Sequence, residues 1–403
     1  MTKRNADSAP SRDRVLLLTP DAPYPVVGGG ALRVASLIEY FGRHYDLDVL
    51  VFREPRAHDP APFFPPGLAK RVEVIALPAN SRSMAAKAIR NARRFAAGVP
   101  PLVDRFSGFE AEIERRIAGN RYKLALVCHL WCARYRDVLA RHADSVGLDL
   151  PNVESALFAR MAESEPWPER LLHRRFAACS AALERELLPR YSFLLTTSDA
   201  DRELVKGLNR RVEVYPNTIP LGPRPEASRS DAILFTGNLE YHPNVTAVRH
   251  FRDHIWPLIA AARPGVKWRL GGLNDSGIRH LVAGDPRIEV LGRMENAIET
   301  LAAAKVAVVP LLSGSGTRLK ILEAWAAGTA VVSTRIGAEG LDARDGEHLL
   351  IRDDPAEFAA AVIEVLENPG RAAQLQDAGR CLYEERYTWS AAWEKLGALE
   401  GIY

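Results

Sequence analysis

The chain alternates between short apolar runs and helix-length segments of mixed polarity, and this alternation occurs twice. In the first half the apolar runs are 15–20, 46–52, 72–78, 123–130, 193–198 and 212–217. In the second half they are AILFTGN, VKWRLGG, IEVLG, VAVVPL, AVVST and LLI. Short continuous runs rich in β-branched residues are typical of strands buried on both faces of a parallel sheet. The pattern therefore predicts an α/β protein with two doubly wound, Rossmann-like domains.

A polar, proline-bearing stretch at 218–231 separates the two sets of runs. We expect an N-terminal domain at 1–222 and a C-terminal domain at 223–387, because 403 residues exceed what one core usually holds. Two doubly wound sheets face each other across a cleft with their carboxyl strand edges, and ligands bind at those edges. The loops after the strands are therefore the expected location of the chemistry.

Composition excludes few functions. Lys and Arg number 53 against 50 Asp and Glu, so the formal net charge of +3 does not favour a nucleic-acid partner. The four cysteines show no zinc spacing and are expected to be reduced thiols. No apolar run is long enough for a signal segment or a membrane span. We expect a cytoplasmic protein, one that could also lie peripherally on the inner face of the plasma membrane.

The glycine run before the first amphipathic helix, in PYPVVGGGALR, is a candidate anion site. Backbone amides at such a run can approach an anion at the helix N-terminus, which makes Gly29 and Gly30 candidates for binding a phosphate. The run fits neither the dinucleotide nor the Walker pattern, and a flexible turn explains it equally well.

The segment SGSGTRLKILEAWAAG gives the stronger signal, since a small-residue loop leads from a strand into an apolar helix. Arg318 and Lys320 fall in the first helical turn, where the macrodipole disfavours positive charge. A diphosphate bound to the loop amides and the guanidinium would reverse that cost. Glu323 could accept hydrogen bonds from a ribose diol. The alternative is a solvated cationic face with an ordinary helical glutamate. The loop itself adds the candidates Gly314, Ser315, Gly316 and Thr317.

These residues carry a family resemblance. The C-terminal half, from LFTGNLEYHPNVTAV through GSGTRLKILEAWAAGTAVVSTRIGAEGL to RYTWSAAW, resembles glycosyltransferase family 4 of the GT-B fold, in particular bacterial transferases that build surface glycans. The N-terminal half resembles it more loosely. The resemblance implies transfer from a nucleotide diphosphate sugar of the UDP or GDP type to a glycan or lipid-linked acceptor, with retention and without a cofactor. It also implies that the terminal helix at 388–403 packs back on the N-terminal domain, so Trp389 is not a binding residue.

The resemblance assigns roles position by position. Glu323 matches the second glutamate of the family's Glu-x7-Glu pattern, which contacts the ribose. Ser315 stands where the family has the glutamate that contacts the donor sugar, so the loop amides would have to serve instead. The family usually has an Arg and a Lys that bind the diphosphate shortly after the first strand of the C-terminal domain. This chain has neither. The corresponding segment, GNLEYHPN, offers Gly237, Asn238 and His242 as candidates for donor binding. Arg318 and Lys320 are the candidates for the positive charge that the diphosphate needs.

Several cleft candidates come from other loops. His129 follows an apolar strand and resembles the cleft histidine of the family, which would make it catalytic together with Arg318, although such a histidine is as often structural. Asn152 and Glu154 in DLPNVES could bind acceptor hydroxyls, and helix capping is the alternative for Asn152. Glu339, beside flexible glycines, is a further cleft candidate.

Residues 81–97 predict a basic amphipathic helix that could contact anionic lipid. The alternative is a solvated surface helix. Membrane contact would make the acceptor a lipid-linked sugar at the cytoplasmic leaflet. The basic residues are Arg82, Lys87, Arg90, Arg93 and Arg94, and the other face holds Met84, Ile89 and Phe95.

Two other functions share this architecture. A nucleotide-sugar 2-epimerase would need paired carboxylates in the cleft, which the sequence does not reveal. A catalytically silent GT-B binding subunit would explain the loss of the sugar contact at Ser315. No Asp-x-Asp motif lies in a loop suited to hold a metal with a diphosphate, so we expect metal-independent chemistry.

Overall fold

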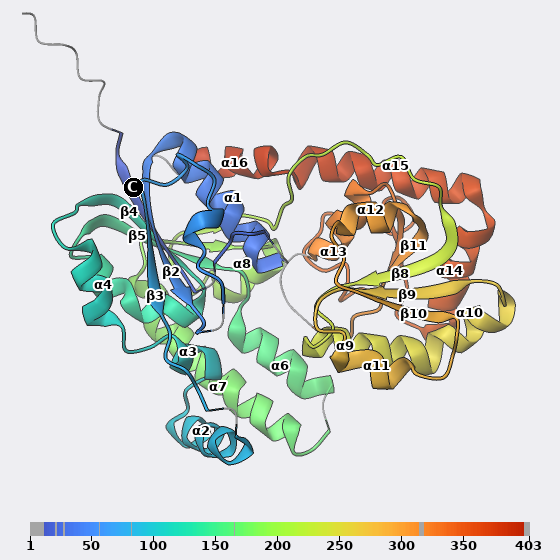
Figure 1. Ribbon diagram of the computed structural model, residues 1–403, viewed down its shortest axis with the longest axis horizontal. Helices are drawn as coiled ribbons and strands as arrows, with labels where there is room; N and C mark the ends of the chain where they lie inside the picture. Colours follow the sequence, from blue (N-terminus) through green and yellow to red (C-terminus); the bar gives the residue numbers. More distant parts are fainter. Residues whose placement is uncertain are drawn as a thin grey trace, which may run out of the picture.

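The computed structural model describes residues 12–20, 22–26, 29–55, 57–81, 83–164, 166–313 and 318–398. The predicted loop candidates 314–317, and Arg82 of the basic helix, lie outside the described residues. Figure 1 shows two α/β lobes side by side, each built around its own sheet.

The N-terminal sheet has seven parallel strands in the order β3-β2-β1-β4-β5-β6-β7. One of them, β5, is not among the predicted apolar runs, because Asp144, Ser145, Gly147 and Asp149 interrupt its apolar pattern. The strands are β1 (Arg14–Thr19), β2 (Asp46–Arg53), β3 (Arg71–Ala76), β4 (Tyr122–Cys128), β5 (Ala143–Leu150), β6 (Phe193–Thr196) and β7 (Val212–Val214).

The C-terminal sheet has six parallel strands in the order β10-β9-β8-β11-β12-β13. Together the two sheets confirm the predicted pair of doubly wound α/β domains. The strands are β8 (Ser230–Thr236), β9 (Lys267–Gly271), β10 (Ile288–Gly292), β11 (Ala304–Val309), β12 (Ala330–Ser333) and β13 (Leu350–Ile351).

Helices cover the sheets, and most begin in a loop that leaves a strand. Those of the N-terminal lobe are α1 (Gly29–His44), α2 (Met84–Ala97), α3 (Pro101–Arg105), α4 (Glu110–Ile117), α5 (Arg136–Leu139), α6 (Glu154–Ser164), α7 (Glu169–Leu187) and α8 (Asp199–Val205). Those that follow are α9 (His242–His250), α10 (Trp256–Ala262), α11 (Ser276–Val282), α12 (Ala297–Ala302), α13 (Leu319–Ala326), α14 (Pro355–Glu367), α15 (Pro369–Arg386) and α16 (Trp389–Gly397).

The chain crosses between the lobes twice, and the two crossings touch. Ile219, in the linker from β7 to β8, forms a parallel bridge with Thr388, which precedes α16. Helix α16 then lies on the N-terminal lobe, where the Trp393 indole donates to the carbonyl and hydroxyl of Ser36 on α1, at 3.1 Å each. The two connections between the lobes therefore run side by side at this point.

A buried ion pair fixes the start of α1. Arg33 donates to both carboxylate oxygens of Asp149 at the end of β5, with Nε–Oδ2 at 2.9 Å. Arg33 also donates to the carbonyl of Tyr215, at 2.7 Å, just after β7. Both charged side chains are almost completely buried. The pair therefore ties the glycine-bearing end of α1 to the sheet and to the interdomain linker.

Candidate functional site

A cavity of about 440 Å³ lies at the carboxyl edge of the C-terminal sheet. Its walls come from the loops after β8, β9, β10 and β11 and from the start of α13, with Gly30 of α1 contributed by the other lobe. Helix α1 begins at Gly29, so Gly29 and Gly30 are its first residues rather than the turn that the sequence suggested. The N-terminus of α1 therefore adds a favourable dipole for an anion in the cavity.

Two glycines allow the cavity loops to approach each other closely. A Cβ on Gly237, at φ 150°, would lie 2.7 Å from the Asn244 amide nitrogen and 3.4 Å from Lys320 Nζ. A Cβ on Gly272, also at φ 150°, would overlap the carbonyl oxygen of Gly237. Only glycine fits at these positions, because any side chain would push α9 and α13 away from the sheet edge.

A chain of hydrogen bonds crosses the cavity wall. Lys320 Nζ donates to Asn244 Oδ1 at 2.7 Å, and Asn244 Nδ2 donates to the Asn238 carbonyl at 2.8 Å. The Asn238 side chain in turn accepts from Asn274 at 3.1 Å. Lys320 also lies over the Phe235 ring, 4.5 Å from its centroid. The ammonium group is therefore held in one position at the floor of the cavity.

Charges in the cavity are strongly desolvated. Burial, and then the nearby Arg318, lower the pKa of Lys320 to about 7. Burial raises the pKa of Glu323 to about 7, with Lys320 opposing the shift. Both groups can therefore change charge near neutral pH, and an anionic ligand would favour the protonated lysine. Among the described lining residues, three are cations, Arg293, Arg318 and Lys320, and one is an acid, Glu323.

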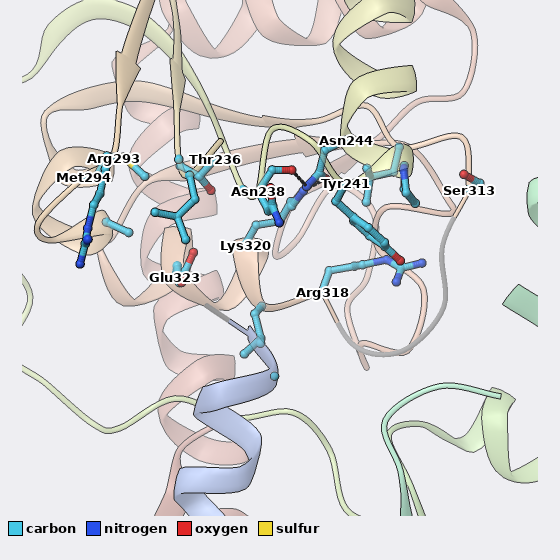
Figure 2. A pocket seen from close by; sticks show the side chains of 18 residues that line it. Thr236, Asn238, Tyr241, Asn244, Arg293, Met294, Ser313, Arg318, Lys320 and Glu323 are labelled. Carbon is cyan, nitrogen blue, oxygen red and sulfur yellow. Dashed lines mark hydrogen bonds between the residues drawn. The ribbon is translucent and has the colours of Figure 1, made fainter. Parts of the chain in front are cut away.

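Arg318 is almost buried at one end of the cavity, where Figure 2 shows its guanidinium beside Tyr241. It donates to the carbonyl of Ile336 at 3.4 Å and lies 4.0 Å from Glu339 Oε2. Glu339 is also bound by both terminal nitrogens of Arg160 on α6, with Nη2–Oε1 at 2.8 Å. Glu339 thus links the two lobes beside the cationic end of the cavity.

Sequence reasoning missed several lining residues. Arg293 follows β10 at the opposite end from Arg318, and it makes no hydrogen bond or ion pair with the part of the chain that is described. Its position directly after a strand is a signal that could have found it. Ser313 lines the cavity with a buried hydroxyl that has no described hydrogen-bond partner. The other missed residues are Thr236, Tyr241, Pro243, Asn244, Gly272, Leu273, Met294, Ala297, Leu311 and Leu319.

His129 lies directly after β4 with a left-handed backbone, at φ 69°. Its ring stacks on Trp131 with centroids 4.3 Å apart, and the residue is almost buried. Burial, and then the charge of Arg33, lower the pKa of His129 to about 3. The imidazole is therefore neutral at physiological pH in the free protein, and in this form it can donate and accept hydrogen bonds.

Glu154 begins α6 and is buried, and its carboxyl accepts from the Trp131 indole at 3.2 Å. Burial raises the pKa of Glu154 to about 7. Burial also raises the pKa of Tyr241, and that pKa responds to both Arg318 and Glu154, so groups from both lobes meet here. Asn152 is half-buried just before α6. His242, the first residue of α9, is not among the residues that line the cavity.

Comparisons with known proteins bear on the family and the fold. Residues 230–368 match the family model Glycosyl transferases group 1. An uncharacterized 44.6 kDa protein in the cps region of Klebsiella pneumoniae is 26% identical over 144 residues, 34% of this chain and 37% of that protein. A GDP-mannose-dependent monoacylated alpha-(1-6)-phosphatidylinositol monomannoside mannosyltransferase of Corynebacterium glutamicum is 29% identical over 152 residues, 35% of this chain and 40% of the relative. Each match thus spans about two-fifths of the relative's length.

The whole chain also resembles solved structures. HepE from Anabaena, in complex with UDP and glucose, superposes with a TM-score of 0.66 at 13% identity, covering 96% of this chain and 99% of HepE. At this identity the likeness shows the fold, and it confirms the predicted GT-B arrangement of two Rossmann-like domains. In the described ranges, no helix is long and apolar enough to cross a membrane.

Proposed function

We propose that the protein transfers a sugar from a nucleotide diphosphate sugar to a glycan or lipid-linked acceptor, with retention, because residues 230–368 match the Glycosyl transferases group 1 model and the chain has the GT-B fold. The observation that carries the proposal is the cavity at the C-terminal strand edges, whose described charged residues are three cations and one carboxylate. A diphosphate supplies the negative charge that such a lining favours, and a ribose supplies hydroxyls for the carboxylate.

In this proposal the nucleotide lies along the cavity. Arg318 and Lys320 stabilise the diphosphate, and Glu323 accepts hydrogen bonds from the ribose. Arg293, which no described group neutralises, adds positive charge at the other end. These side chains supply the charge compensation that a metal ion supplies in other transferases, so the proposed reaction needs no metal.

The proposed acceptor approaches from the N-terminal lobe. His129 and Glu154, with Asn152 nearby, lie at the ends of β4 and β5 and offer hydrogen-bonding groups for sugar hydroxyls. The high pKa of Glu154 means that near pH 7 its carboxyl can either donate or accept a hydrogen bond. This proposal treats His129 as a neutral partner in positioning the reacting sugar.

A nucleotide thermal-shift screen tests the donor site. The Corynebacterium relative is named for GDP-mannose and the HepE structure contains UDP, so UDP, GDP and ADP should be compared. One of them should stabilise the wild type, by about 2.7 kcal/mol at a concentration 100-fold above Kd, and Glu323→Ala should remove the shift. Glu357→Ala, at an acidic residue in the first turn of α14, is the control.

Activity assays then separate the functions. A transferase releases nucleoside diphosphate from the donor only when an acceptor is present, whereas an epimerase interconverts nucleotide sugars without one. A silent binding subunit would bind nucleotide and do neither. If no nucleotide stabilises the wild type, the proposed donor site is wrong.

Nucleoside diphosphate affinity should fall as the pH rises from about 7 to about 9. Lys320 has a pKa of about 7 in the free protein, and a bound diphosphate raises this pKa, so binding takes up a proton in this range. The affinity loss should approach roughly tenfold per pH unit until the pKa of Lys320 in the complex is reached, as proton linkage requires.

Isothermal titration calorimetry at several pH values measures this loss of affinity. Lys320→Gln should flatten the dependence and Lys267→Gln should not, since Lys267 is paired with Glu289 outside the cavity. A slope that survives in Lys320→Gln would contradict the assignment.

A further inference from the structure

Helix α2 presents its apolar side to solvent and part of its basic side to the protein. None of its fourteen residues is buried. Three half-buried residues, Ala86, Arg90 and Arg94, recur every fourth position and therefore face the body of the protein. On the other side, Met84 is 79% exposed and Ile89 is 70% exposed. Surface helices of globular proteins normally have the opposite orientation, with the apolar stripe turned inward.

Polar contacts fix the helix in this orientation. The Ser83 hydroxyl accepts from the Ala86 amide at 3.2 Å, and the left-handed Gly98 ends the helix. Arg94 makes an ion pair with Asp104 at 2.7 Å. Helix α2 also packs against α7, where a Cβ on Gly98 would lie 3.2 Å from Cys179 Sγ. The helix is therefore held without using its apolar face, which remains available for a partner.

The charge of this surface identifies the kind of partner. From Met84 to Ala97 the helix has four basic residues and no acidic one. Lys87 and Arg93 are exposed and flank the apolar face. Trp167, just before the adjacent α7, and Leu171 in its first turn are 78% and 54% exposed. Figure 1 shows α2 and the first half of α7 together at the lower margin of the N-terminal lobe, away from its sheet.

We propose that α2, with the start of α7, docks the protein on an anionic lipid bilayer. Met84, Ile89 and Phe95 would enter the boundary between headgroups and acyl chains, while Lys87 and Arg93 contact lipid phosphates. A second copy of the chain is a poorer partner, since it would bring two basic surfaces together. Docking on the bilayer does not depend on the proposed function. One consequence rests on it: if the protein is a transferase, its acceptor is a lipid-linked sugar in that bilayer.

Sedimentation of the full chain with vesicles tests the proposal. The wild type should sediment with vesicles of phosphatidylcholine and phosphatidylglycerol, and much less with phosphatidylcholine alone. The triple variant Met84→Ser, Ile89→Ser, Phe95→Ser should bind at least about tenfold more weakly, because its apolar face is removed. Lys87→Gln with Arg93→Gln should weaken binding and reduce its dependence on salt. The matched control replaces Leu204, Leu221 and Leu258, which are comparably exposed elsewhere, by Ser.

Two results of the sedimentation experiment would overturn the proposal. Equal sedimentation of the wild type and the triple Ser variant would show that α2 is not the docking surface, and absence of wild-type binding would show that no bilayer is bound. Analytical ultracentrifugation distinguishes self-association, in which the wild type would be a dimer and the triple Ser variant a monomer. Nucleotide binding by the same proteins, measured by thermal shift, reports on the proposed function independently. Because the three replaced side chains are exposed, the variants should fold, and circular dichroism checks this.

Discussion

Replacement of Arg33 by Met should lower the free energy of unfolding by about 3–5 kcal/mol. Arg33 and Asp149 are almost completely buried, so removal of the guanidinium leaves an uncompensated carboxylate in the interior. The substitution also removes the hydrogen bond from Arg33 to the Tyr215 carbonyl, which secures the interdomain linker. Urea denaturation followed by circular dichroism measures the loss.

The exposed ion pair between Arg121 and Asp144 provides the control, since both side chains are mostly in solvent. Arg121→Met should cost no more than about 1 kcal/mol. Replacement of both buried partners, as Arg33→Met with Asp149→Leu, should recover part of the stability, because no charge is then left unpaired. Equal losses for Arg33→Met and Arg121→Met would show that the buried pair contributes no more than a surface pair.

The same ion pair is one reason why β5 was absent from the predicted strands. Most strands in this fold are apolar on both sides because helices cover both faces of the sheet, and their pattern is visible locally. In β5, Asp149 interrupts the pattern, and its partner Arg33 lies 116 residues earlier in the chain. A buried charge becomes understandable only when its partner is known, and nothing local to β5 identifies that partner.

The residues of the candidate site also differ in how far the sequence alone reveals them. Arg318 and Lys320 could be predicted because their charges conflict with the dipole at the start of the helix, and Glu323 because it follows in the same short segment and matches the family's ribose-binding glutamate. Arg293 follows a strand, which marks it as a candidate, but its place beside Asn244 and Lys320 could not be predicted, since these residues reach the cavity from separate loops that only the sheet order brings together. The outward apolar face of α2 was also unpredictable, because the helical period shows that a face exists but not which way it points.

Replacement of Arg318 by Ala should reduce turnover by about two to three orders of magnitude, or raise the KM for the donor, if the proposed transferase reaction is correct. The Arg318 side chain is almost buried, and the charges nearest to it are those of Glu339 and Arg160, both at the boundary of the two lobes. A guanidinium in such a desolvated position stabilises charge that develops on a leaving diphosphate far more than an exposed one does. Initial rates of nucleoside diphosphate release, measured over a range of donor concentrations, separate kcat from KM.

Arg335 provides a control that tests whether the effect depends on where the arginine lies. Arg335 belongs to the same lobe, 81% of its side chain is exposed, and its nearest acid, Asp353, lies 3.5 Å away. Arg335→Ala should therefore leave kcat and KM near their wild-type values. Arg318→Lys keeps the charge but loses the forked geometry, so its turnover should lie between those of the wild type and Arg318→Ala. Unchanged kcat and KM in Arg318→Ala would exclude Arg318 from binding the diphosphate and would leave that role to Lys320 and Arg293, the other two cations that line the cavity.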